Sequence, residues 1–273
     1  MPDGVVIIIL IGVVAGLLSG MFGIGGGTII VPSLMVFLGL EQTLANGTSL
    51  AALLLPVGIF ACIAYYREGK LIIRLAVLLA LGLIIGTWFG AGFALDMYPA
   101  VLQLSYSLFL FYIAWRYMAP IKWYNDWKGN KEETVKEDTD VQVLGPKILG
   151  GMVFIGFCAG ILSGMFGIGG GALIVPMLMV FLRFDQKLAQ GISLGSLLLP
   201  VGISGVIQYN QAGDVDFMIA GIIAVMLATF AFIGAKLALS LPTKIVKRSF
   251  GIFIFLIGIR FFTWAIALIM AGS

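Results

Sequence analysis

Ser19-Gly20-Met21-Phe22-Gly23-Ile24-Gly25-Gly26-Gly27 is the stretch that decides the fold, because the chain contains it twice. The same nine residues return unchanged 144 positions later, as Ser163 to Gly171. Around them, residues 16–58 and 160–202 are identical at 31 of 43 positions without a gap. The chain therefore consists of two related halves, and each half carries one glycine-rich interruption.

The composition indicates that the solvent of this chain is a lipid bilayer. Of its 273 residues, 61% are hydrophobic and only 11% are charged. A soluble domain of this size and composition would expose large apolar patches to water. Internal duplication in a membrane protein is typical of transporters, whose binding site lies where the two halves meet.

The residues that are missing exclude several classes of function. The chain has no His, so imidazole metal ligands and His general bases are excluded. Cys62 and Cys158 form no CxxC pair, and we expect them to be small buried hydrophobic residues. We expect no enzyme, no catalytic residue, no metal, no cofactor and no nucleic-acid partner. The start, Met1 to Gly4, has no basic residue, so we do not expect the first apolar run to be a signal peptide.

Each half contains five apolar stretches, which predict an all-α polytopic membrane protein. They run at about 4–19, 28–40, 43–65, 71–95 and 98–118, and then at 148–163, 172–184, 187–208, 215–239 and 244–269. The third, fourth and fifth stretches are long enough to cross a ~30 Å hydrocarbon core as one helix. The first two are shorter, and the second is too short for an upright crossing. A polar segment at 120–147 separates a first repeat, 1–119, from a second, 148–273, and we expect it to be a cytoplasmic linker.

The placement of Lys and Arg predicts that the two repeats are inverted. Turns with Lys or Arg lie at 67–74, 183–187 and 244–248, whereas the equivalent turns of the other half, at 211–216, 41–43 and 96–98, contain neither residue. Because basic turns stay in the cytoplasm, equivalent turns lie on opposite sides of the membrane. We therefore expect a multi-pass protein of the cell inner membrane with both termini outside. Six spans plus two re-entrant hairpins, and up to ten spans, both satisfy this pattern.

The glycine-rich interruptions carry the chemistry. Four glycines within Gly23 to Gly27 interrupt a helix, and broken backbone at membrane depth must be buried in protein or line a cavity. The helix that begins after the break has unpaired N–H groups and the positive end of its dipole there, which favours an anion. We expect the second break, at Gly167 to Ala172, to converge on the same anion. The alternative is that these glycines only allow close helix packing.

A second repeated motif supplies polar side chains. It reads Ala45-Asn46-Gly47-Thr48-Ser49-Leu50 and is echoed as Ala189-Gln190-Gly191-Ile192-Ser193-Leu194. Two residues after each copy comes Leu-Leu-Leu-Pro-Val-Gly. Its neutral donors suit the oxygens of an anion, although hydrogen bonds between helices are an equal alternative. Glu41 and Asp185 are expected to mark turns at membrane surfaces. The candidate substrate-binding residues are Ser19, Gly23, Gly25, Gly26, Gly27, Asn46, Thr48, Ser49, Ser163, Gly167, Gly169, Gly170, Gly171, Gln190 and Ser193.

On these residues the chain resembles the TauE/SafE-type sulfite exporter family of membrane permeases. The resemblance rests on the repeated SGMFGIGGG followed by Val-Pro, on the AxGxSLxxLLLPVG run, and on the polar linker between the halves. It implies passage of a small sulfur-containing oxyanion such as sulfite or an organosulfonate. The second half has Ile192 where the first has Thr48, so the two half-sites are not chemically identical.

The sequence therefore predicts a permease for a small oxyanion that works by alternating access between inverted repeats. The alternatives are a passive small-anion channel and a permease for another small organic anion. An intramembrane enzyme is disfavoured because the chain lacks His, an HExxH motif and a buried pair of acids. The sequence leaves open the particular oxyanion, the direction of transport, the coupling ion and the oligomeric state.

Overall fold

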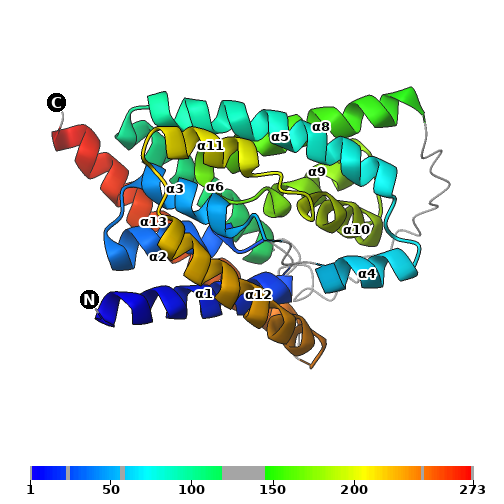
Figure 1. Cartoon of the computed structure of the whole chain (residues 1–273), viewed down its shortest axis with the longest axis horizontal. Helices are drawn as coiled ribbons and strands as arrows, with labels where there is room; N and C mark the ends of the chain where they lie inside the picture. Colours follow the sequence, from blue (N-terminus) through cyan, green and yellow to red (C-terminus); the bar gives the residue numbers. More distant parts are fainter. Residues whose placement is uncertain (1, 23–24, 56–58, 119–144, 241–242, 272–273) are drawn as a thin grey trace, which may run out of the picture. The chain divides into compact units, whose positions relative to one another are not determined.

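The computed structural model describes residues 2–22, 25–55, 59–118, 145–240 and 243–271, and within these ranges every regular element is an α-helix (Figure 1). This confirms the all-α prediction. Most of the predicted linker, 120–144, lies outside the described residues. The helices of the first half are α1 (Pro2–Phe22), α2 (Gly27–Leu38), α3 (Gln42–Ala52), α4 (Ile59–Arg67), α5 (Ile73–Asp96) and α6 (Pro99–Met118). Those of the second are α8 (Pro146–Phe166), α9 (Gly171–Phe181), α10 (Gln186–Leu197), α11 (Ile203–Gln211), α12 (Phe217–Ser240) and α13 (Thr243–Ala271).

The helix boundaries repeat with the same offset as the sequence. Each helix of the second half begins 144 residues after its counterpart, from Pro2 and Pro146 to Pro99 and Thr243. Helices α1, α5, α8, α12 and α13 contain stretches long and apolar enough to cross a membrane. The duplication is therefore a duplication of structure, and the chain has the helices that a multi-pass membrane protein requires.

The third stretch of each half is not one helix, which corrects the prediction of a continuous span. In the first half it is divided between α3 and α4, and in the second between α10 and α11. Pro200 lies in the interval between α10 and α11. Proline lacks an N–H group and its ring clashes with the carbonyl four residues earlier, so here it ends the helix rather than only bending it.

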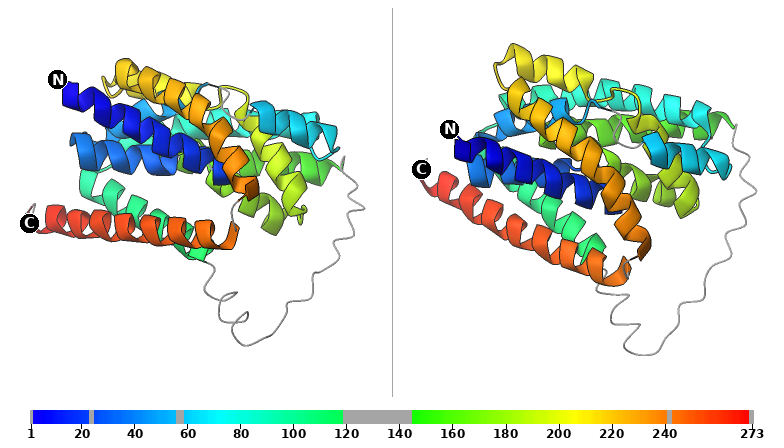
Figure 2. Two further views of the ribbon diagram at one scale, coloured as in Figure 1. Left: turned by 90° about the horizontal axis from the view of Figure 1, so that it is seen from below. Right: turned by 60° about the horizontal axis from the view of Figure 1, so that its bottom comes forward.

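The helices form two compact units, and each unit contains helices of both halves. One unit comprises residues 1–96 and 141–239, and the other comprises residues 97–140 and 240–273. In the second unit α6 and α13 lie side by side (Figure 2). Phe111 and Phe255 pack between them with ring centroids 5.4 Å apart. The compact units therefore do not follow the boundary between the repeats.

Within the first unit, close helix pairs join one half to the other. Helices α5 and α8 lie side by side (Figure 1), with glycines on both facing surfaces. A Cβ atom on Gly86 would lie 2.1 Å from the Phe157 carbonyl oxygen, and one on Gly160 would lie 2.5 Å from that of Leu83. The equivalent pair, α1 with α12, is built in the same way, since a Cβ on Gly20 would lie 2.0 Å from the Ala231 carbonyl oxygen. Small residues allow this approach of backbones, which is how helices associate in lipid.

The shorter helices follow the same reciprocal rule. Helix α3 packs against α11, and its equivalent α10 packs against α4. A Cβ on Gly47 would lie 2.2 Å from the Asp214 carbonyl oxygen, and one on its equivalent Gly191 would lie 2.1 Å from that of Lys70. Each half therefore completes the packing of the other.

Candidate functional site

The two glycine-rich breaks have the same backbone geometry. Gly26 precedes α2 with φ 82° and ψ −25°, and Gly170 precedes α9 with φ 82° and ψ −26°. This left-handed conformation favours glycine because other residues meet a steric penalty there. Neither helix has a side-chain cap.

The first backbone N–H groups after each break have no acceptor within their own helix. In α2 the N–H groups of Ile29 and Ile30 bond to the Gly26 carbonyl oxygen, and α9 repeats this with Gly170. The N–H groups of the first two residues of each helix precede these bonds, and intrahelical geometry offers them no partner. Each break therefore ends at a helix N-terminus that carries donors and a positive dipole end.

The two breaks lie next to each other. A Cβ on Gly27 would lie 2.5 Å from the Gly167 carbonyl oxygen and 2.6 Å from Cα of Ile168. Gly25 also faces Ile168, whose carbonyl oxygen would lie 3.7 Å from an added Cβ. The start of α2 thus adjoins the segment between α8 and α9, although the two are separated by about 140 residues of chain.

Three side chains hold the end of α8 at this junction. Asn46 Nδ2 donates to the Met165 carbonyl oxygen at 2.6 Å, and Ser49 Oγ donates to that of Gly167 at 2.7 Å. The Tyr209 hydroxyl donates to the Gly164 carbonyl oxygen at 2.9 Å. The last carbonyls of a helix need such partners. Asn46 and Ser49 therefore lie at the junction, but these donors serve the backbone of α8.

The other polar residues of the second motif have partners elsewhere. Thr48 Oγ1 accepts a hydrogen bond from the backbone N–H of Asp216 at 3.0 Å, just before α12. Gln190 Oε1 accepts one from the Tyr65 hydroxyl at 2.9 Å. Ser193 is buried within α10. The hydrogen bonds of Thr48 and Gln190 connect helices, which is the alternative that the sequence left open for them.

Each half places a buried serine beside its own cap glycine. Cβ of Ser19 would lie 3.6 Å from a Cβ added at Gly26, and that of Ser163 would lie 3.8 Å from one at Gly170. Gly169 and Gly171 belong to the second break, with Gly169 at φ 75° and Gly171 as the first residue of α9. Gly23 lies outside the described residues.

One polar residue of the junction was missed at the sequence level. Thr28, the second residue of α2, is fully buried, and its Oγ1 has no hydrogen-bond partner. Asn46 Oδ1 is a second buried atom without a partner. The signal was present in the sequence, because Thr28 is the one polar residue directly after the first break and the second half has Ala172 in its place.

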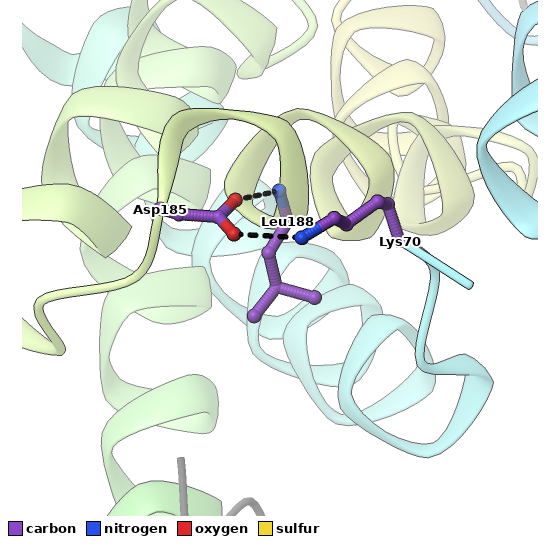
Figure 3. Close-up of polar contacts among 3 residues, drawn as sticks. All are labelled: Lys70, Asp185 and Leu188. Atoms are coloured by element: carbon purple, nitrogen blue, oxygen red, sulfur yellow. Dashed lines mark hydrogen bonds and ion pairs between the residues drawn. The ribbon is translucent and has the colours of Figure 1, made fainter. Parts of the chain in front are cut away.

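Away from the junction, an ion pair joins the two halves. Lys70 Nζ lies 3.0 Å from Asp185 Oδ2, and the other oxygen of Asp185 accepts from the Leu188 N–H (Figure 3). Burial alone raises the pKa of Asp185, but the hydrogen bonds from the Leu188 N–H and from Lys70 outweigh it, so the pKa lies below its ordinary value. Asp185 caps α10, in agreement with its predicted place at a turn. The repeat equivalents of the pair, Asp214 and Glu41, are both acidic and cannot form an ion pair.

Comparison with known proteins gives the family. The family model described as Sulfite exporter TauE/SafE matches residues 8–261, so the chain belongs to this family. It is 27% identical to the "Probable membrane transporter protein YunE" of Bacillus subtilis, over 89% of this chain and 90% of that protein. It is 29% identical to the "Probable membrane transporter protein MJ0441" of Methanocaldococcus jannaschii, over 88% of this chain and 86% of that protein. No solved structure matches.

Among the described residues, no group of three or more Cys, Asp and Glu is placed to hold a metal ion.

Proposed function

We propose that this member of the Sulfite exporter TauE/SafE family is a permease for a small oxyanion, such as sulfite or an organosulfonate. The observation that carries the proposal is the junction of the two breaks. There, α2 and α9 both begin at a left-handed glycine without a side-chain cap, and the two breaks adjoin each other. Free N–H groups and the positive dipole end make such helix starts ready anion sites.

The chemistry of the junction supports a negative ligand. The glycines at 25–27 and 169–171 place no side chain of their own beside the N–H donors. The C-terminal carbonyls of α8, which would repel an anion, are occupied by Asn46, Ser49 and Tyr209. In the low dielectric of a membrane protein these fixed dipoles act more strongly than they would in water. The Ser19 and Ser163 hydroxyls complete the proposed site.

Contacts between turns support the inverted arrangement of the repeats. Two turns that the charge pattern places in the cytoplasm, 67–74 and 183–187, are joined by Lys70 and Asp185. The turn at 211–216, predicted to lie outside, reaches α3 through the bond between Asp216 and Thr48. Inverted halves that complete each other's packing can exchange conformations, which gives alternating access to a shared site. The location in the inner membrane, with both termini outside, belongs to this proposal.

Flux in proteoliposomes tests the function. We expect purified protein to carry sulfite with saturable kinetics, and internal unlabelled substrate to drive counterflow of labelled substrate. Methanesulfonate should compete, and empty liposomes give the background. Flux that never saturates and shows no counterflow would establish a channel instead, and the absence of any anion flux would refute the proposal.

A matched pair of variants tests the position of the site. Gly25 (φ 82°) and Gly213 (φ 84°) have similar backbone strain for any side chain, but only Gly25 lies at the junction. Gly25→Leu should abolish sulfite flux because its side chain fills the space beside the N–H groups. Gly213→Leu faces nothing within 4 Å and should retain flux. Equal flux in the two variants would place the anion elsewhere.

A further inference from the structure

The two helix starts at the junction differ in one polar atom. Thr28 gives the first turn of α2 a hydroxyl, and the equivalent residue in α9 is Ala172. Thr28 is fully buried. Side chains of a helix tilt toward its N-terminus, so this hydroxyl is directed toward the end of α2 whose first N–H groups have no acceptor within the helix.

The Thr28 hydroxyl has no partner, unlike those of Thr87 and Thr229 in α5 and α12. Thr87 donates to the Leu83 carbonyl oxygen at 2.7 Å, and Thr229 donates to that of Val225 at 2.8 Å. Both use the carbonyl four residues earlier, as threonines in membrane helices commonly do. Thr28 stands in the first turn of α2, where the helix offers no such carbonyl, and its Oγ1 bonds to nothing. A buried hydroxyl without a partner lowers stability, so packing gives no reason for a hydroxyl here.

The two breaks also differ in access. Gly25 is partly buried, and the nearest atom to an added Cβ there is the Ile168 carbonyl oxygen at 3.7 Å. Its equivalent Gly169 is buried, and Leu53 Cδ1 would lie 2.9 Å from a Cβ there. The repeat equivalent of Leu53 is Leu197, which does not come within 4 Å of a Cβ on Gly25. Gly25 is therefore less covered than Gly169, although Leu227 Cδ1 of the opposite half would lie 2.7 Å from a Cβ on the neighbouring Gly26.

We propose that the anion binds at the start of α2 alone in this conformation, and that Thr28 is the side chain that donates to it directly. The inference rests on the proposed function and names the residue that sets its specificity. The N–H groups of Gly27 and Thr28, together with the Thr28 hydroxyl, place three donors within two residues. Three donors suit a group with three oxygens, such as sulfite or the head of a sulfonate, better than a planar carboxylate with two oxygens.

Binding to purified full-length protein in detergent tests this assignment, with sulfite and methanesulfonate as separate probes and acetate for comparison. Thr28→Val keeps the shape and removes the hydroxyl, so we expect its affinity for both sulfur anions to fall about ten- to hundredfold. Thr28→Ser should keep most of the affinity. Thr87→Val removes a buried hydroxyl of α5 that already has a partner, and it should bind as the wild type does.

Stability gives a second readout that a merely structural role of Thr28 would not produce. Without anion, Thr28→Val should unfold at the same or a higher temperature than the wild type, because it removes an unsatisfied buried group. With anion, it should lose the stabilisation that the wild type gains. If Thr28→Val does not fold, Thr28→Ala is measured in the same way.

The outcomes separate the two proposals. Wild-type affinity in Thr28→Val or Thr28→Ala, together with loss of flux in Gly25→Leu, would overturn the role of Thr28 and leave the permease intact. Equal affinity of the wild type for acetate and methanesulfonate would overturn the preference for three oxygens. A wild-type protein that neither binds nor carries these anions would refute the proposed function itself.

Discussion

At the scale of single residues, Arg183 has a left-handed backbone conformation that normally favours glycine. This residue follows α9 with φ 55°, and its repeat equivalent after α2 is Gly39 with φ 66°. Both helices end in the same turn, in which the N–H of Leu40 or Phe184 bonds back to the Leu34 or Leu178 carbonyl oxygen. A left-handed residue other than glycine costs roughly 1–2 kcal/mol. The positive-inside rule gives a physical reason for an arginine at this position, because the turn belongs to the predicted cytoplasmic side.

Asp185 gives a residue-scale prediction with a defined pH dependence. Asp185→Ala removes the cap of α10 and the ion pair, so it should lower the free energy of unfolding by about 1 kcal/mol at pH 7. Asp185→Asn keeps a good capping residue and loses the ion pair. It should cost only about 0.5 kcal/mol, because the Lys70 side chain is 36% exposed and solvent screens the pair. Thermal unfolding in detergent measures both differences.

The pH dependence of Asp185 follows from the direction of its pKa shift. Its pKa is lower in the folded protein than in the unfolded chain, where it is about 3.9. The ionised form therefore contributes stability that is fully present above this unfolded pKa and is lost as pH falls through the lower folded pKa. The stability difference between wild type and Asp185→Asn should be constant from pH 7 to 5 and shrink below pH 4. A difference that grows on acidification would contradict the ion pair.

At the scale of elements, α5 and α8 can pack closely because the glycines at their contact have no side chain. A Cβ on Gly86 would lie 2.1 Å from a backbone carbonyl of α8, and rigid backbone cannot move aside as a flexible side chain can. Gly86→Val should therefore lower the free energy of unfolding by at least about 2 kcal/mol. Gly221 in α12 is the control, because nothing lies within 4 Å of an added Cβ there. Gly221→Ala should be neutral or stabilising by up to about 1 kcal/mol, since alanine favours a helix. Equal thermal stability of the two variants would show that the close α5–α8 contact is not what holds this pair.

Much of the element list was predictable, and the exceptions have local causes. Apolar length predicts α5 and α12, and the glycine run predicts the interval before α2 and α9. Helices α1 and α8 each have 21 residues and are longer than the short first stretches predicted for them. The division of the third stretch was missed because apolar length says nothing about where Pro200 ends a helix. The role of Asn46 at the end of α8 was not predictable, because a sequence pattern does not show which carbonyl lies opposite an amide.

At the scale of the whole molecule, the sequence predicts the duplication but not the pairing. The identical stretches fix the offset of 144 residues between equivalent elements. Charge counting assigns turns to sides of the membrane, and it contains no information about which helices are neighbours. The pairing of α1 with α12 and of α5 with α8 depends on glycine faces that meet only after folding. Thr28 became a candidate only when the structure showed that its hydroxyl is buried without a partner.

The inversion of the repeats gives a prediction for the whole chain. Glu68 and Ala212 occupy equivalent turns 144 residues apart, and both are exposed. Single cysteines are placed at either position after Cys62 and Cys158 are replaced by alanine. An impermeant maleimide applied to intact cells should label Ala212→Cys, whereas Glu68→Cys should react only after the membrane is permeabilised. The reason is that the first turn carries Arg67, Lys70 and Arg74, and basic turns stay in the cytoplasm. The charged residues of the second turn are Asp214 and Asp216, so the same rule predicts that it lies outside. The cysteine-free protein gives the background, and labelling of both positions from the same side would show that the repeats are parallel.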